Sequence, residues 1–259
     1  MTAHDNPLGL DGFEFVEFTG PDPDALAGLF TALGFTHMGN HKTKNVRHYA
    51  QGDINFILNM EPSGQASEFR GAHGPSANAM AFRVKDARKA FEMAVERGAT
   101  PVETPRGPDE LDIPAIEGIG GSLLYLVDRY GAERIYDVDV EIAYFDIEGQ
   151  QTALVSRAMT APDDKIRIPL NESQDEHSQI EEFLREYKGE GIQHIALATD
   201  DIFATVDQLR ANGIKFQDSP DTYFDMIDER LPGHDHDVAE MRKRKILIDG
   251  SPETGEGLL

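Results

Sequence analysis

The chain has 259 residues, with 24 Lys and Arg against 47 Asp and Glu, no cysteine, and a formal net charge of −23 at pH 7. This charge excludes nucleic-acid binding as a function, because phosphates require a basic surface. Without cysteine, disulfide-stapled domains and cysteine-ligated metal sites are excluded too. No apolar run approaches the ~20 residues that span a bilayer, and Met1–Leu10 lacks the features of a signal peptide. The composition predicts a soluble cytoplasmic protein with no nucleic-acid or membrane partner and an acidic, solvated surface.

Three stretches share one pattern: a short β-like run, an aspartate, an apolar-periodic segment, and a glycine twelve residues after the aspartate. The β-like runs are Phe13–Phe18, Ala79–Val84 and His194–Ala198. The apolar spacing between each aspartate and glycine predicts a helix. The aspartates are predicted to cap the helix starts and the glycines to end the helices in a left-handed conformation. These pairs are Asp22 and Gly34, Asp86 and Gly98, and Asp201 and Gly213.

Each glycine is followed by further β-like segments. In the first copy, Asn45–Ala50 and Ile54–Asn59 are joined by Gln51–Asp53 and predict a hairpin. The repeated unit is therefore a βαβββ module. A glycine-rich stretch at Gly118–Gly121 lacks the strand–loop–helix context of a phosphate-binding loop and is predicted to be a bend.

The module starts, near residues 12, 76 and 191, leave room for a fourth copy beginning near residue 140. Strand-like stretches occur there (Ile142–Ile147, Thr152–Arg157 and Ile166–Leu170) without a preceding strand–Asp–helix–Gly unit. The last module is also short after Lys245–Asp249. We predict an α+β fold in which paired βαβββ modules form two half-barrel domains, residues 6–137 and residues 138–259, the second incomplete.

His194 is a candidate metal ligand. Aligned on the terminal glycine, it corresponds to Ala79 in the second module and Phe15 in the first, so the module does not need histidine there for packing. The alternative is a hydrogen-bonded core histidine. Neutral polar groups nearby suit a keto acid or a phenol, although each is otherwise a cap or surface residue: Ser156, Asn171, Gln179 and Gln193.

The chain resembles bacterial 4-hydroxyphenylpyruvate dioxygenases, which belong to the vicinal oxygen chelate superfamily. The resemblance spans nearly the whole chain in the family's order. It is carried by Asn6–Phe15, His73–Ser76, Ile113–Gly121, Tyr144–Ile147, Ala158–Pro162, Lys165–Glu172, Gly189–His194 and Pro220–Tyr223.

The resemblance implies an enzyme that holds Fe(II) with two His and one Glu, leaving positions for substrate and O2. Such an enzyme converts 4-hydroxyphenylpyruvate to homogentisate and CO2 in tyrosine and phenylalanine catabolism. His194 matches one iron ligand of the family. Ser156, Asn171, Gln179 and Gln193 match polar residues that line its substrate pocket. The resemblance also implies a homodimer or homotetramer.

Two segments of the family pattern are absent. The family's other iron-binding His lies on the opening strand of the third module, and its Glu lies on a strand beyond Leu259. Either the sequence records part of a longer chain, or the protein lacks these segments and the chain alone is inactive. Two alternative functions stay open: hydroxymandelate synthase, and a non-catalytic, metal-free binding paralogue.

Overall fold

The structure is a computed structural model that describes residues 6–104, 106–108, 110–142, 158–160, 165–171, 179–251 and 255–258. The strands are β1 (Leu10–Thr19), β2 (Thr36–His41), β3 (Val46–Gln51), β4 (Ile54–Asn59), β5 (Ser76–Val84), β6 (Pro101–Val102), β7 (Ala115–Glu117), β8 (Leu123–Val127), β9 (Val140–Ile142), β10 (Ala158–Thr160), β11 (Arg167–Pro169), β12 (Ile248–Ser251) and β13 (Gly255–Leu258). The helices are α1 (Pro23–Ala32), α2 (Gln65–His73), α3 (Ala87–Glu96), the 3-10 turn η1 (Ile119–Gly121), α4 (Ile135–Asp139), α5 (Gln179–Tyr187), α6 (Ile202–Ala211), α7 (Asp221–Asp225), α8 (Ile227–Arg230) and α9 (Val238–Arg244).

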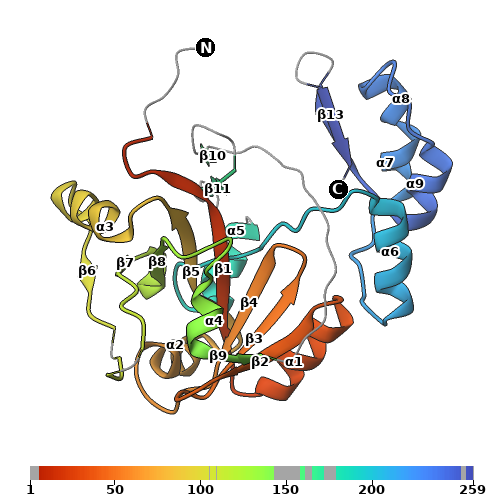
Figure 1. Ribbon diagram of the computed structural model, residues 1–259. Coiled ribbons are helices and arrows are strands. Elements are labelled where there is room, and N and C mark those ends of the chain that lie inside the picture. The colour runs from red at the N-terminus through yellow and green to blue at the C-terminus, as the bar shows by residue number, and fades with distance from the viewer. Residues whose placement is uncertain are drawn as a thin grey trace.

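Within the described residues, nine strands form one sheet in the order β6-β7-β8-β5-β1-β4-β3-β2-β9 (Figure 1). Two βαβββ modules build it. The first strand of each module pairs parallel with the last strand of the same module, β1 with β4 and β5 with β8. The two opening strands, β1 and β5, pair antiparallel and join the modules. The α+β fold and its paired modules are therefore confirmed.

The helix boundaries follow the predicted caps. Each capping aspartate accepts a hydrogen bond from the backbone N–H three residues later, at 2.9–3.0 Å, as seen at Asp22, Asp86 and Asp201. Each terminal glycine has a φ between 89° and 102°, as seen at Gly34, Gly98 and Gly213. The predicted hairpin is β3 and β4, and the predicted bend is the η1 turn.

Helices α1 and α3 cover the same face of the sheet. Val16 on β1 packs in the core cluster of α1, and its cross-strand partner Met80 packs against the cluster of α3. The neighbouring strand residues point to the other face because side chains alternate along a strand. There Phe15 and Ala81 form a third cluster with Ile135 and Tyr136 of α4. We call this face, lined by Phe15 and Ala81, the inner face.

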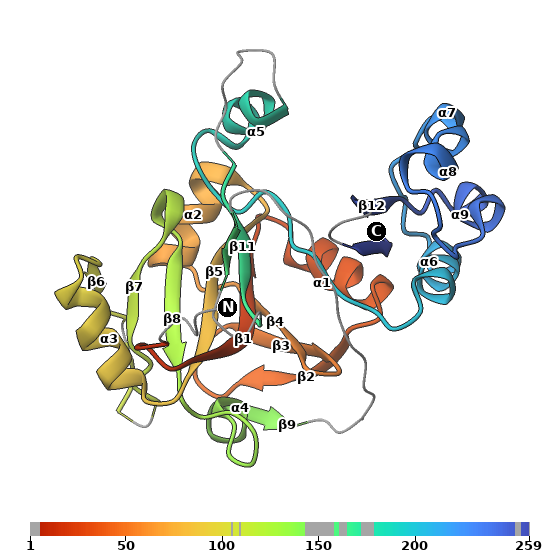
Figure 2. The ribbon, with the colours of Figure 1, turned by 90° about the horizontal axis from the view of Figure 1, so that it is seen from above.

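The C-terminal part of the chain divides between two cores. Ile166, next to β11, is buried in the cluster of α3, so the β10–β11 hairpin packs on the N-terminal sheet. Helices α6 to α9 gather to one side of that sheet around their own buried residues (Figures 1 and 2). These are Val206, Phe224, Ile227, Leu231, Met241, Ile246 and Ile248. The predicted domain boundary at 137/138 falls inside α4 and stays a prediction.

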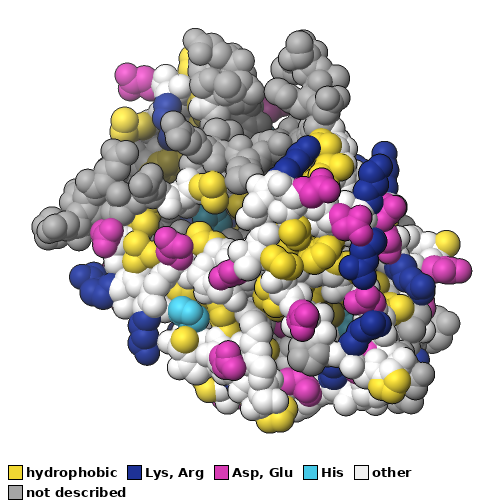
Figure 3. Space-filling model, turned by 90° about the vertical axis from the view of Figure 1, so that its left-hand side faces the viewer, with side chains coloured by type: hydrophobic (Ala, Val, Ile, Leu, Met, Phe, Trp, Pro, Cys, Tyr) yellow, Lys and Arg dark blue, Asp and Glu magenta, His cyan; other side chains and the backbone are white. Residues whose placement is uncertain are grey.

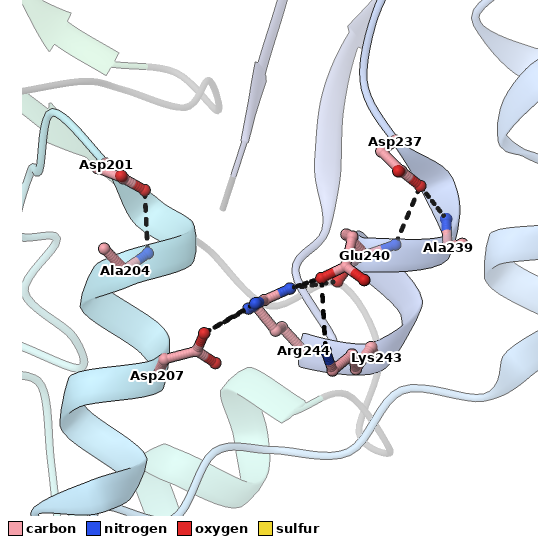
Figure 4. A network of polar contacts seen from close by, with 8 residues as sticks. All are labelled: Asp201, Ala204, Asp207, Asp237, Ala239, Glu240, Lys243 and Arg244. Atoms are coloured by element: carbon pink, nitrogen blue, oxygen red, sulfur yellow. Dashed lines mark hydrogen bonds and ion pairs between the residues drawn. The ribbon is translucent and has the colours of Figure 1, made fainter.

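Arg244 ties two helices of this second core together (Figure 4). Its Nε and Nη2 atoms donate to one carboxylate oxygen of Asp207 on α6, at 2.9 and 2.8 Å. Its Nη1 atom donates to Glu240, one turn earlier on α9. Paired carboxylates in this geometry hold the planar guanidinium in one orientation and fix the α6–α9 contact.

One predicted strand is wrong. His194–Ala198 lies in residues 191–199, which form no strand. In the N-terminal half, the corresponding strand β5 lies between β1 and β8 and pairs with both. No strand of the described part pairs with residues 191–199, and a strand without a ladder partner loses the hydrogen bonds that define it.

The other late β-like stretches meet different outcomes. Ile166–Leu170 contains β11, and Lys245–Asp249 overlaps the start of β12. Ile142 ends β9, a short edge strand on β2, whereas the remaining predicted stretches near it lie outside the described residues.

The surface carries interspersed charges. Figure 3 shows one face on which the acidic and basic side chains of the described residues lie interspersed. Over the described part of the chain, no helix has the length and apolarity required to cross a bilayer.

Candidate functional site

The structure places the predicted site residues along the C-terminal part of the chain. Gln193 and His194 are both exposed, and their side chains meet, with the His194 Nδ1 atom 3.4 Å from Gln193 Oε1. Asn171 is exposed two residues after the end of β11, and Gln179 is the first residue of α5. Ser156 lies outside the described residues. Gln193 and His194 are in contact, and convergence of the whole predicted set stays a prediction.

The described donors do not fit an iron site. Facial coordination of Fe(II) requires two imidazoles and a carboxylate around one point. No group of three His, Asp or Glu residues within the described ranges could hold a metal ion. The His194 imidazole has the Gln193 amide as a polar neighbour, and an amide supplies no anionic ligand. No chemical step through iron therefore follows from these residues.

The N-terminal half shows where the module places the residue that corresponds to His194. On the antiparallel pair of opening strands, Phe15 pairs with Ala81 and Glu17 pairs with Ala79. Phe15 and Ala79 are thus related by a pseudo-twofold axis between the two strands. Ala79 is fully buried, and it shares the inner face with Glu17 and Phe15. In a complete module, the position of His194 faces inward.

In the N-terminal half, the inner face is filled by helix α4. Ile135 and Tyr136 are both buried there against Phe15. The Tyr136 ring stacks on His48, with centroids 3.9 Å apart and planes at 11°. The His48 Nε2–H donates to Asn55 Oδ1 at 2.8 Å, and burial lowers the pKa of His48 to about 4. The His48 ring is therefore buried, stacked on Tyr136 and hydrogen-bonded through Nε2.

The inner face also holds a buried carboxyl group, that of Glu17, which the sequence analysis did not identify as a candidate. Glu17 Oε1 accepts hydrogen bonds from Asn59 Nδ2 at 3.0 Å and from Asn78 Nδ2 at 2.6 Å. Desolvation by burial raises the pKa of Glu17. Its sequence signal was an acidic residue inside the β-like run Phe13–Phe18, at an inward position. Glu17 and the two asparagines that donate to it lie beside Ala79, the counterpart of His194.

Two family models match the chain. The model of the hydroxyphenylpyruvate dioxygenase N-terminal domain matches residues 4–141. The model of the glyoxalase, bleomycin resistance protein and dioxygenase superfamily matches residues 124–226. Together they cover both the nine-stranded sheet and part of the C-terminal half.

Curated relatives match over nearly the whole chain. Hemolysin VllY of Vibrio vulnificus is 50% identical over 95% of this chain and 83% of its own length. The 4-hydroxyphenylpyruvate dioxygenase of Pseudomonas aeruginosa is 50% identical over 95% of this chain and 82% of its own length. The alignment with the Vibrio protein spans 296 positions, yet 95% of this chain is only about 246 residues. About 50 aligned positions of that relative therefore have no counterpart here.

Solved structures share the fold. A fusion protein of a xylose isomerase-like TIM barrel and a 4-hydroxyphenylpyruvate dioxygenase has a TM-score of 0.77 and 31% identity, covering 95% of this chain and 45% of that chain. A triple variant of 4-hydroxymandelate synthase from Streptomyces coelicolor has a TM-score of 0.68 at 18% identity, covering 94% of this chain and 86% of that chain. The chain belongs to the 4-hydroxyphenylpyruvate dioxygenase family of the vicinal oxygen chelate superfamily.

Proposed function

We propose that the protein acts on 4-hydroxyphenylpyruvate with O2 and forms homogentisate and CO2. The observation that carries the proposal is the 50% identity to the Pseudomonas aeruginosa 4-hydroxyphenylpyruvate dioxygenase over 95% of this chain. Membership of an oxygenase family supports an oxygenase function. The cofactor under this proposal is Fe(II), which requires ligands besides His194.

His194 is the proposed metal-binding residue. Support comes from the module symmetry, because its counterpart Ala79 is buried on the inner face next to Glu17. A histidine at that position in a complete second half would point into the corresponding pocket. Its imidazole would then supply one neutral nitrogen ligand.

The substrate-binding residues are proposed from their chemistry. A keto acid offers acceptor oxygens and a phenol offers one hydroxyl, both of which neutral side chains can bind without adding charge. The proposed set is Ser156, Asn171, Gln179 and Gln193. Two of its members flank one element: Gln179 begins α5, and Gln193 follows the end of α5 by six residues.

A second candidate is a non-catalytic, metal-free binding protein of the same family. Two observations favour it: the described residues hold no three-donor cluster, and about 50 aligned positions of the Vibrio relative are absent from this chain. A protein of this kind would bind the keto acid and leave it unchanged.

Anaerobic reconstitution with Fe(II) separates the candidates. If the protein is the dioxygenase, it retains about one iron per chain and forms homogentisate from 4-hydroxyphenylpyruvate in air, as measured by iron analysis and chromatography. The His194→Ala variant should lose both, whereas His37→Ala, an exposed histidine of the N-terminal half, should keep both. Binding of the keto acid with neither iron nor product would establish the second candidate. Hydroxymandelate as the product would show the synthase reaction instead.

A further inference from the structure

The chain just before His194 packs directly on the glycine-rich η1 turn of the N-terminal half. Gly120 has φ 62°, and a Cβ atom there would overlap the carbonyl oxygen of Glu190 and lie 2.8 Å from the Glu190 carbonyl carbon. The backbone of Glu190 therefore lies against the Cα atom of Gly120 at a distance that no side chain allows. Gly121 also has a positive φ, 79°, but a Cβ atom there would meet nothing within 4 Å.

The next residue, Gly191, lies against Tyr187, the last residue of α5. A Cβ atom at Gly191 would lie 2.8 Å from Tyr187 Cζ and 2.9 Å from the Tyr187 hydroxyl oxygen. Gly191 therefore covers one edge of the Tyr187 ring. The same ring stacks on Phe183, with centroids 4.8 Å apart and planes at 18°. The backbone of residues 190–191 thus runs between the Tyr187 ring and the η1 turn.

Helix α2 links both sides of this contact. At its first residue, the Gln65 Nε2 atom donates to the Gly121 carbonyl oxygen at 3.0 Å, which holds the η1 turn. At its last residue, the His73 Nδ1–H donates to the Tyr187 carbonyl oxygen at 2.6 Å. The His73 ring also stacks on the Tyr187 ring, with centroids 4.4 Å apart and planes at 15°. One nine-residue helix therefore fixes the turn at one end and α5 at the other.

We propose that α2 and the η1 turn form a platform on which α5 and the Gly189–Gly191 segment dock, and that this platform sets the position of Gln193 and His194. Gly120, Gly191 and His73 are positioning residues under this proposal. It deepens the proposed function, because it assigns a role to the N-terminal half, whose inner face is filled by α4. Only Ile192 and Gln193 separate the clamped Gly191 from His194, so a displacement of Gly191 is passed on to His194 over a short stretch of backbone.

The adjacent glycines provide a matched pair of variants. Gly120→Ala and Gly121→Ala both force alanine into a left-handed backbone conformation, but only the methyl group at position 120 collides with Glu190. A nine-residue helix is marginal by itself, so the amide protection of α5 depends on its docking. We expect hydrogen–deuterium exchange of α5 to accelerate about tenfold in Gly120→Ala and less than twofold in Gly121→Ala. The His73→Ala variant, which keeps the turn intact, should also accelerate it.

A second readout follows His194 itself. The ring resonances of His194, assigned with a His194→Gln variant, should shift in Gly120→Ala and in His73→Ala while staying at the wild-type position in Gly121→Ala. Equal α5 exchange in the two glycine variants, or an unchanged His194 signal when α5 exchange accelerates, would overturn the proposal. Both measurements use the metal-free chain, so they decide the platform even if the protein forms no homogentisate.

Discussion

Glu17 is a single residue whose titration makes the free energy of unfolding depend on pH. Burial raises its pKa above the ordinary value of 4.5. The native state therefore keeps this proton to higher pH than the unfolded state does. The free energy of unfolding should fall as pH rises from 4.5 through the raised pKa, because the native state binds the extra proton in that window.

The Glu17→Gln variant removes this titration and keeps an oxygen that accepts from Asn59 and Asn78. Relative to wild type, its free energy of unfolding should rise with pH, by about 1.4 kcal/mol for each pH unit that separates the folded and unfolded pKa values. Urea unfolding between pH 4.5 and pH 8 measures the difference. Glu117→Gln, at an exposed position, is the control and should run parallel to wild type. A parallel curve for Glu17→Gln would contradict the prediction.

Asp86 shows how one side chain determines an element boundary. Its carboxylate accepts from Lys89 N at 2.9 Å and satisfies an amide at the start of α3. We expect Asp86→Ala to lower the free energy of unfolding by about 1 kcal/mol, the usual effect of losing an N-cap. Glu92→Ala, which removes the same charge from an exposed site on α3, should change it far less. Equal losses in urea unfolding would mean that charge, and not the cap, is responsible.

The α6–α9 contact is a second test at the scale of elements. Arg244 donates two hydrogen bonds to Asp207, a geometry that the single ammonium of lysine does not reproduce. Arg244→Lys should lower the Tm at low salt. The difference from wild type should shrink in 1 M NaCl, because the Debye length there is only about 3 Å. Lys89→Arg on α3 keeps the charge and serves as the control. A salt-independent difference would point to packing instead of the ion pair.

Local signals were sufficient to predict the three repeat helices α1, α3 and α6, whereas the strand predicted at His194–Ala198 is wrong. A cap and a left-handed glycine act within a few residues, so Asp22 and Gly34 determine where α1 begins and ends. A strand depends on a partner distant in sequence. His194–Ala198 has the composition of an opening strand, but the described chain provides no opening strand to pair with it. The docking of Gly191 on Tyr187 was equally hidden, since close packing against glycine leaves no pattern in a single sequence.

At the scale of the whole molecule, the repeat predicted the N-terminal half, where two βαβββ modules pair through their opening strands. In the N-terminal half, the pairing of β1 with β5 joins the two modules into one sheet. The C-terminal half builds a helical core around α6 to α9 instead of a second sheet of this size within the described residues. The site residues Asn171, Gln179 and His194 lie in this half, where the described residues form no second large sheet, so their convergence stays a prediction.

The unpaired segment 191–199 should make the chain prone to self-association. Ile195 and Leu197 are 36% and 41% exposed, next to backbone that no described strand pairs. Such segments present both apolar side chains and free ladder positions to another chain. The net charge of −23 opposes contact between chains, so association should appear when salt screens that repulsion.

We expect sedimentation velocity in 0.5 M NaCl to show more oligomer for the wild type than for the double variant Ile195→Thr, Leu197→Thr. The control is Leu29→Thr, which removes a side chain that is 46% exposed on α1, where the helix satisfies the backbone. Single exposed apolar residues are common on folded proteins and carry little association energy. If Leu29→Thr reduces the oligomer as much as the double variant does, exposed apolar area alone drives association and the unpaired segment has no special part in it.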